Sequence, residues 1–331
     1  MLKTSNPTSV NPLSTLYQPI EADIQRVEER LKMELVSRFD LVEELLLKSN
    51  RLSGKRLRPA LLLLFARALG NVTEEHITLA TAVEMIHTAT LIHDDILDGA
   101  NQRRHTATLH AEYGNQIAIL TGDYLFSHAF FLTSTLPTTY PAREIGISTN
   151  KICEGEIRQI GTKGKLHLAE EDYIEIIDAK TAALCRCATK LGVYLGDATE
   201  HEIQLAAQYG TGLGIAFQII DDLLDIIGTE IETGKSLGTD LEQRKPTLPL
   251  IHLLSQIKPG EKPEFCRQLS AGKIGNTELA EKMDRYGSIQ YCKQTAKKFA
   301  NEAASCIAWL PESAAKKVLK ALPEFTLNRV F

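Results

Sequence analysis

The stretch LIHDDILDGANQRR, residues 91–104, sets three carboxylates among apolar residues and follows them with two arginines. Asp94 and Asp98 are four residues apart, so on a helix both side chains lie on one face, with Cβ atoms about 6 Å apart. A second stretch, FQIIDDLLDI at 217–226, repeats this acidic spacing. Carboxylates among apolar residues are costly unless something compensates their charge. The sequence therefore predicts two acidic helix faces that need a cation between them.

Mg²⁺ is the cation that suits such faces best. It prefers oxygen ligands, keeps several waters, and takes the rest of its shell from one or two carboxylates and from substrate phosphates. A single DDxxD motif is more often a solvated helix face. Here the motif occurs twice, and both copies lie in apolar surroundings, TATLIHDDIL at 88–97 and IAFQIIDDLLDII at 215–227. We therefore expect the two faces to hold one diphosphate through bridging metal ions.

Basic residues follow both acidic stretches and also precede the first. SGKRLRP spans 53–59, QRR spans 102–104, and GKSLGTDLEQRKPTLPL spans 234–250. Arginine suits bidentate recognition of phosphate, and lysine acts as a point charge. Each of these cations taken alone could be an ordinary surface charge. Their shared position beside acidic clusters and glycine-containing turns predicts two anion sites, one through metal ions and one through side chains alone.

The spacing of proline and of apolar residues predicts an all-α fold. No proline occurs between Pro59 and Pro137 or between Pro141 and Pro246, and an interior proline breaks a helix. The segment 20–47 carries apolar residues at helical spacing, and a helix is expected from about Glu75 to Asp94. No repeat or low-complexity linker divides the chain. We expect a mobile lead-in over 1–19 and one helical domain over 20–331.

Composition narrows the class of protein. The 331 residues carry 37 basic and 42 acidic side chains, a net charge of −5, which argues against general nucleic-acid binding. The longest apolar run, Ala60–Ala66, is too short to span a bilayer. The N-terminus lacks the apolar core of a secretory signal, and the six cysteines form no CxxC pair. These features predict a soluble, cytoplasmic protein with reduced cysteines.

The motifs, taken in order, resemble those of the trans-isoprenyl diphosphate synthases, especially the long-chain polyprenyl members. The matching segments are GKRLRP (54–59), EMIHTATLIHDDILD (84–98), QRR (102–104), GDYL (122–125), EGEIRQ (154–159), KTAAL (180–184), GIAFQIIDDLLD (214–225) and GKSLGTDLEQRKPTLPL (234–250). The resemblance covers roughly residues 50–255. It implies a single-domain isoprenoid-synthase-type helical bundle around a central active-site cavity, and a head-to-tail (1′-4) condensation of isopentenyl diphosphate onto an allylic diphosphate.

The resemblance also implies a role for individual residues. The expected ligands of Mg²⁺ are six aspartates: Asp94, Asp95, Asp98, Asp221, Asp222 and Asp225. Three Mg²⁺ ions are expected per active site, and Mn²⁺ is expected to substitute. The residues expected to hold isopentenyl diphosphate without metal are Lys55, Arg58, His87 and Arg104. Those expected at the allylic diphosphate are Arg103, Lys180, Lys235 and Lys245.

The residues expected to take part in catalysis are Lys180, Thr181 and Gln218. Thr181 and Gln218 would turn oxygen dipoles towards the cation that develops when the allylic C–O bond breaks. Gln218 could instead be a polar residue hydrogen-bonded within the core, and His87 could be a satisfied buried histidine. In this family the released diphosphate is the expected base, so no catalytic histidine is required.

Product length depends on side chains along the helix before the first acidic cluster. The fifth residue before Asp94 is Ala89, which is too small to stop a growing chain, and Met85 lies one turn deeper. A helix from about residue 75 to 94 supplies roughly 30 Å of wall. We expect an all-trans product of about C35–C50, with octaprenyl (C40) as first choice, for quinone side chains. Farnesyl diphosphate is the expected primer, and a shorter geranylgeranyl product is the alternative.

Other readings of the sequence stay open at this point. A terpene cyclase shares the fold and the first acidic motif, a non-catalytic synthase subunit shares the fold, and a plain helical scaffold would bind no diphosphate. The intact second motif and GKRLRP argue against all three. The resemblance further implies a homodimer, and an apolar product makes transient membrane contact plausible.

Overall fold

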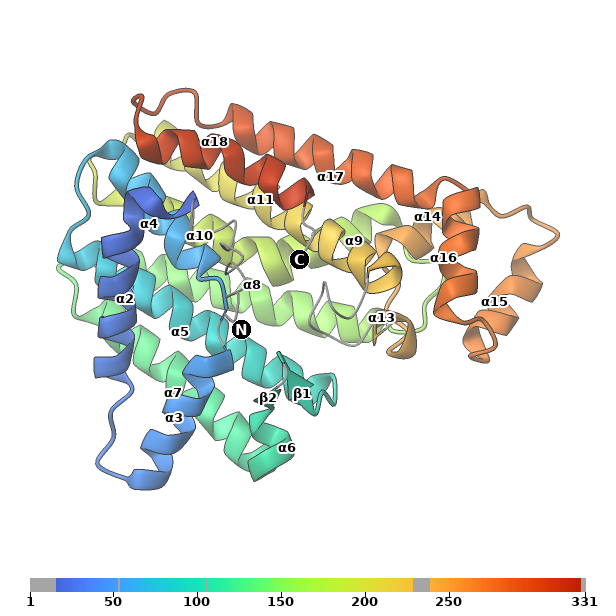
Figure 1. Ribbon diagram of the computed structural model, residues 1–331, viewed down its shortest axis with the longest axis horizontal. Coiled ribbons are helices and arrows are strands. Elements are labelled where there is room, and N and C mark those ends of the chain that lie inside the picture. The colour runs from blue at the N-terminus through green and yellow to red at the C-terminus, as the bar shows by residue number, and fades with distance from the viewer. Residues whose placement is uncertain (1–15, 53, 105, 229–238, 329–331) are drawn as a thin grey trace, which may run out of the picture.

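The computed structural model describes residues 16–52, 54–104, 106–228 and 239–328 (Figure 1). Its helices, in chain order, are a 3₁₀ turn η1 (Gln18–Ile20), α2 (Glu21–Glu34), α3 (Asp40–Leu52), α4 (Leu57–Leu69), α5 (Glu74–Leu97), α6 (Leu109–Tyr113), α7 (Asn115–Ser134), α8 (Tyr140–Thr162), α9 (Glu170–Ile177), a π-helical turn η2 (Asp178–Ala182), α10 (Ala183–Tyr194), α11 (Glu200–Ile227), α13 (Thr239–Glu242), α14 (Leu248–Gln256), α15 (Lys262–Ser270), α16 (Asn276–Arg285), α17 (Ser288–Ser305) and α18 (Ala314–Leu327). A short ribbon, β1 (Gln102–Arg103) and β2 (Thr106–Ala107), follows α5.

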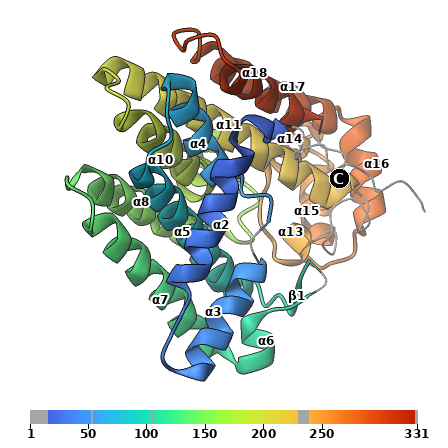
Figure 2. The same cartoon turned by 60° about the vertical axis from the view of Figure 1, so that its left-hand side comes forward.

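The predicted all-α class is confirmed, and α4, α5, α10 and α11 form its centre. In α4 the run from Ala60 to Phe65 is fully buried, because these six consecutive residues, ALLLLF, are apolar on every face of the helix. Helix α4 packs on α5 and α10, α11 packs on α10 and α17, and α7 packs along α5. Figures 1 and 2 show α17 and α18 along one side of this bundle and α3 and α6 on the opposite side.

The two long helices that carry the acidic motifs begin with the same device. Thr73 before α5 and Thr199 before α11 each accept a hydrogen bond from the backbone three residues later, and that residue's side chain reaches back to the cap. Such capping boxes fix where a helix starts. The boxes therefore lie at one end of α5 and α11, and the aspartates lie at the other.

The structure bears on three predicted segments, 20–47, 1–19 and 75–94. The helical segment expected over 20–47 is split into α2 and α3, because Ser37 Oγ accepts a hydrogen bond from the Phe39 N–H at 3.2 Å and turns the chain. The expected lead-in over 1–19 falls mostly on residues outside the described part. The helix expected from 75 to 94 is present as α5. Over the described ranges, we find no helix with the length and apolar character needed to cross a bilayer.

Candidate active site

Both acidic clusters lie at the carboxyl ends of their helices. Asp94 and Asp98 are at the end of α5, and Asp221 and Asp225 are in the last two turns of α11. The helix dipole gives this end a partial negative charge, so carboxylates there are unfavourable unless a cation is close. Within the described residues, no three histidine, cysteine or carboxylate side chains converge closely enough to hold a metal ion unaided.

A short segment before α14 connects the two clusters. Lys245 Nζ lies 3.1 Å from Asp98 Oδ1 and 3.8 Å from Asp240 Oδ1. The Asp240 N–H in turn donates a hydrogen bond of 3.0 Å to Asp225 Oδ2. This chain of contacts runs from the end of α5 to the end of α11. The structure thus brings Lys245, predicted at the allylic diphosphate, between the two acidic clusters.

The middle aspartate of the first cluster points to a protein partner. Asp95 is 1% exposed, and Arg103 holds its Oδ1 through Nε at 2.9 Å and Nη2 at 2.8 Å. Burial raises the pKa of Asp95, and the bond from Arg103 opposes that rise. Its Oδ2 accepts no hydrogen bond from any described residue. Arg103, predicted at the allylic diphosphate, therefore lies beside the first cluster, where Asp95 neutralises part of its positive charge.

The middle aspartate of the second cluster is held by neutral donors. Tyr173 donates its hydroxyl to Asp222 Oδ2 at 2.7 Å, and Gln218 Nε2 donates to Asp222 Oδ1 at 2.6 Å. Burial raises the pKa of Asp222 well above its usual value, and the charges of Asp240 and Asp221 add to this effect. Both oxygens of this predicted metal ligand are thus occupied by protein groups.

The π-helical turn places Lys180 and Thr181 against α8 and α11. A Cβ at Gly155 of α8 would lie 2.7 Å from the backbone nitrogen of Lys180. A Cβ at Gly214 of α11 would lie 2.6 Å from the Cα of Ala182. Glycine at both positions therefore allows the close approach of three backbones. The resulting position of Thr181 lets its hydroxyl donate a 2.7 Å hydrogen bond to Gln218 Oε1. The two predicted catalytic oxygens are therefore in contact.

Lys180 lies between the first acidic cluster and α8. Its Nζ is 2.5 Å from Glu156, 3.0 Å from Gln159 Oε1 and 3.9 Å from Asp94. Burial works against its charge, but Asp94 and Glu156 outweigh this and raise the pKa of Lys180. The motif EGEIRQ at 154–159 did not predict a role for Glu156. Glu156 and Gln159 are three residues apart and share one helix face, but no local spacing connects them to Lys180.

Asp94 shares a raised pKa with the two middle aspartates, Asp95 and Asp222. Burial raises the pKa of Asp94 to about 6, Lys180 lowers it, and the negative charges of Glu156 and Asp98 raise it further. When the pKa of a carboxyl is raised in this way, a nearby positive charge stabilises its ionised form. The first cluster therefore carries more negative charge than its protein partners neutralise.

The predicted metal-free anion site gathers around α4 and α5. Arg58 Nη1 lies 3.1 Å from His87 Nε2. Burial lowers the pKa of His87 well below its usual value, and the charges of Arg58, Arg103 and Arg104 act in the same direction. A neutral imidazole therefore sits among three guanidinium groups.

A glycine turn holds Arg104 at this site. Arg104 has a left-handed φ of 51°, and a Cβ on Gly54 would lie 2.1 Å from its Nη2. Because Gly54 has no Cβ, its backbone can pack directly against the guanidinium of Arg104. Lys55 is exposed beside it. Arg56, in contrast, bonds Glu28 at 2.5 Å and Glu84 at 2.7 Å, which makes it part of the fold. Lys235 lies outside the described residues.

The wall of the predicted product tunnel is apolar and tightly packed. Ala89 is 0% exposed and Met85 is 1% exposed, both on α5. A small cavity adjoins Met85, between α2, α3, α5 and α7. Phe126 and Phe130 of α7 pack against the main core, whereas Phe131 is 58% exposed. Phe126 and Phe130 therefore lie against the core, where α7 packs along α5, and Phe131 is turned to the surface.

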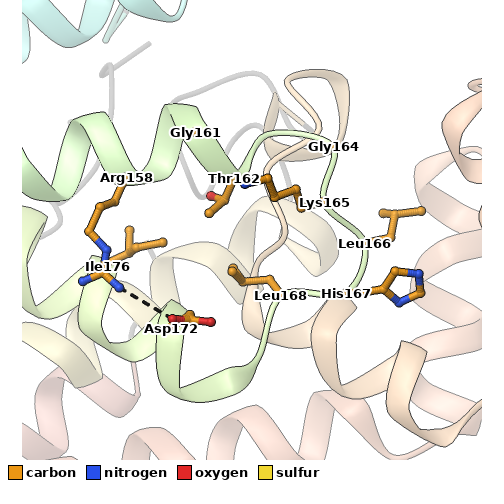
Figure 3. Close-up of a pocket in the computed structure, with 10 residues that line it drawn as sticks. All are labelled: Arg158, Gly161, Thr162, Gly164, Lys165, Leu166, His167, Leu168, Asp172 and Ile176. Carbon is orange, nitrogen blue, oxygen red and sulfur yellow. Dashed lines mark ion pairs between the residues drawn. The ribbon is translucent and has the colours of Figure 1, made fainter.

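A larger cavity, of about 760 Å³, lies at the turn between α8 and α9 (Figure 3). Figure 3 shows Arg158 and Asp172 paired on one side, with Leu168 at the centre and His167 on the other side. Arg158 also bonds Glu175 at 2.8 Å. Across the described residues, none of the side chains predicted for the active site lines this cavity.

Comparison with known proteins decides the family. A model described as "Polyprenyl synthetase" matches residues 40–282. The octaprenyl diphosphate synthase of Haemophilus influenzae is 33% identical over 330 residues, covering 99% of both chains. The chain belongs to the polyprenyl synthetase family. Members of this family are prenyltransferases that act on prenyl diphosphates and use a divalent metal ion, so this chain is an enzyme of that class.

Further polyprenyl synthetase relatives confirm the fold and bear on product length. A polyprenyl synthase from Caulobacter crescentus CB15, solved with calcium and isoprenyl diphosphate, is 30% identical with a TM-score of 0.90 over 98% of this chain and all of its own. The geranylgeranyl diphosphate synthase of Saccharolobus solfataricus is 36% identical over 332 residues, covering 97% and 99% of the two chains. The family and reaction class predicted from the motifs are therefore confirmed, while relatives of similar identity are named for different product lengths.

Proposed function

We propose that this polyprenyl synthetase elongates an allylic diphosphate, with farnesyl diphosphate as primer, to an all-trans C40 product for a quinone side chain. The observation that carries this choice is Ala89, a small buried residue at the position where a bulky side chain would stop chain growth. Behind it the wall of α5 continues past Met85 towards a small internal cavity. A geranylgeranyl product is the alternative, favoured by the similarity to the Saccharolobus enzyme.

The residues of both clusters fit Mg²⁺. The donors are hard carboxylate oxygens, Asp94 has a raised pKa in a site with excess negative charge, and Asp95 Oδ2 has no partner among the described residues. We assign the ions chiefly to Asp94, Asp98, Asp221 and Asp225. Asp95 offers only its Oδ2, because Arg103 binds its Oδ1, and both oxygens of Asp222 are bound by Tyr173 and Gln218. When bound, three Mg²⁺ ions, or Mn²⁺ in their place, would stabilise negative charge on the departing diphosphate.

The cationic side chains then sort into two groups. Lys180, Lys245 and Arg103 stand beside the acidic clusters and neutralise the allylic diphosphate, and Lys235 is proposed to join them. Arg58, Arg104 and Lys55 hold isopentenyl diphosphate without metal. Neutral His87 has one ring N–H to donate to a diphosphate oxygen and adds no charge of its own.

The reaction breaks the allylic C–O bond, and the electron pair leaves with the diphosphate. The Thr181 hydroxyl donates a hydrogen bond to Gln218, so the lone pairs of its oxygen are available to the allylic cation. The double bond of isopentenyl diphosphate forms the new C–C bond, and the adduct then loses a proton to the released diphosphate. Within the described part of the chain, Lys180, Thr181 and Gln218 are the groups that we place next to the reacting carbons.

Assembly is proposed to be homodimeric. Leu120 and Phe131 of α7 are 64% and 58% exposed, and Ile147 of α8 is 46% exposed. Large apolar side chains on one helix face favour burial against a second copy. The apolar product is further proposed to leave by transient contact with a membrane.

Product length tests the proposed tunnel. Ala89→Phe should shorten the main product by one or more isoprene units, because the phenyl ring would block the proposed tunnel beside α5. Leu97→Phe is a matched control on the same helix, since Leu97 is 47% exposed. Products made from farnesyl diphosphate and labelled isopentenyl diphosphate are dephosphorylated and sized by chromatography. The same product length from both variants would show that the tunnel does not pass Ala89.

A further inference from the structure

Tyr173 reaches the active site through a hydrogen-bonded chain of four side chains. Its hydroxyl donates to Asp222 at 2.7 Å, Gln218 donates to the other oxygen of Asp222 at 2.6 Å, and Thr181 donates to Gln218 at 2.7 Å. The chain joins α9, α11 and the π-helical turn. Tyr173 is 3% exposed and Asp222 is 6% exposed, so water has little access to this path.

The direction of each hydrogen bond fixes the orientation of Gln218. An amide side chain has one acceptor oxygen and one donor nitrogen, and either can face a given neighbour. In the structure both oxygens of Asp222 accept hydrogen bonds, one from Tyr173 and one from the amide nitrogen of Gln218, which leaves the amide oxygen for Thr181. If Asp222 moved, the amide could turn and present its N–H groups to the position of the developing cation.

Asp222 itself depends on Tyr173. Apolar residues of α11 and α17 lie on one side of it, including Ile219, Leu223 and Cys292, which pack in the same buried cluster as Tyr173. A carboxylate in such surroundings stays in place when its oxygens are hydrogen-bonded. Tyr173 supplies the bond to Oδ2, and its position in α9 is fixed by packing.

We propose that Tyr173 is a positioning residue for prenyl transfer: it holds Asp222 so that Gln218 keeps its carbonyl oxygen, and Thr181 its lone pairs, turned to the allylic cation. This proposal rests on the proposed roles of Thr181 and Gln218. Because Tyr173 acts on the transition state through Gln218 and touches neither diphosphate, its loss should lower kcat and leave KM for both substrates unchanged.

Tyr173→Phe removes the hydroxyl and keeps the ring. Its kcat should fall about tenfold, the usual scale for loss of an outer hydrogen-bond partner, with both KM values within about twofold of wild type. Tyr209→Phe is the matched control. Tyr209 is also fully buried, on the same helix as Asp222, and donates a 2.7 Å hydrogen bond to the Leu319 carbonyl. Asp222 comes thirteen positions after Tyr209, a separation of about 20 Å along the helix, so the control should lose stability and keep its kcat.

A double-mutant comparison separates positioning from general damage. Gln218→Leu removes the group through which Tyr173 acts, so adding Tyr173→Phe to it should lower kcat no further. An equal kcat for Tyr173→Phe and Tyr209→Phe would overturn the proposal, as would a tenfold loss that persists in the Gln218→Leu background. A wild-type protein that transfers no prenyl group would refute the proposed function and this proposal with it. Activity in wild type with an unaffected Tyr173→Phe variant would refute the positioning role alone.

Discussion

The two acidic clusters share one sequence pattern but compensate their middle carboxylate differently. At the end of α5, Asp95 is bound by the charged Arg103, whereas in α11 Asp222 is bound by the neutral donors Tyr173 and Gln218. A buried carboxylate paired with a cation relies on Coulomb attraction, and one held by dipoles relies on hydrogen-bond geometry. The first cluster is therefore tied to a residue that we place at the diphosphate. The second is tied to residues that orient the catalytic oxygens.

The largest effect is expected from the outer aspartates of both clusters. Asp94→Asn and Asp221→Asn should each lower kcat/KM about 1,000-fold, because each removes a proposed metal ligand worth several kcal/mol in the transition state. Steady-state assays with labelled isopentenyl diphosphate measure the change. Asp172→Asn, an exposed aspartate of α9, is the control and should be active. A loss below tenfold at either outer aspartate would argue against the assignment of the metal ions to these clusters.

The next effect separates the two middle carboxylates. Arg103→Met should lower the free energy of unfolding by about 3 kcal/mol, because it leaves Asp95 buried without its cation. Tyr173→Phe should cost about 1 kcal/mol, the usual value for a neutral hydrogen bond. Urea denaturation without metal measures both. Arg158→Met, which breaks an exposed ion pair with Glu175, should cost less than about 1 kcal/mol. Equal losses for the two buried sites would remove the distinction drawn here between charge and dipole compensation.

Sequence spacing predicted part of this arrangement well. The DDxxD spacing and helical period gave the shared face of Asp94 and Asp98, and the absence of interior proline gave the long helices. The partners of the middle aspartates could not be predicted, because Tyr173 lies 49 residues before Asp222 and no local spacing connects them. The split of the segment 20–47 depends on one hydroxyl, that of Ser37, within an otherwise helical apolar pattern.

The role of Glu156 was missed for a related reason. Its partner Lys180 comes from the π-helical turn, which lies close to α8 and α11 because Gly155 and Gly214 have no Cβ. A glycine in a predicted helix indicates that another segment can pack closely there, but it does not indicate which segment. The identity of the contact comes from the tertiary structure alone.

The smallest expected effect is a pH response of the first cluster. The pKa of Asp94 is raised from its usual 3.8 to about 6, chiefly by burial, so the folded protein holds this proton more tightly than the unfolded chain. This group therefore adds stability that is fully present below about pH 4 and is lost as pH rises through 6. Mg²⁺ competes with the same proton, so its affinity should fall about fivefold from pH 6 to pH 5.

Calorimetric titration of the metal-free protein with Mg²⁺ measures this response. The Asp94→Asn variant is the control, because it has no proton to exchange at this position and its remaining Mg²⁺ affinity should change much less between pH 6 and pH 5. A pH response of wild type that persists unchanged in Asp94→Asn would assign the titrating group to another residue.

The most direct test of the central claim is a product assay of the purified wild-type chain with Mg²⁺, farnesyl diphosphate and labelled isopentenyl diphosphate. We predict Mg²⁺-dependent incorporation of label and a dominant all-trans product of C40 after dephosphorylation and chromatography. A dominant C20 product would keep the reaction and contradict the proposed tunnel length. A folded protein that incorporates no label, with Mg²⁺ or Mn²⁺ present, would contradict the account as a whole.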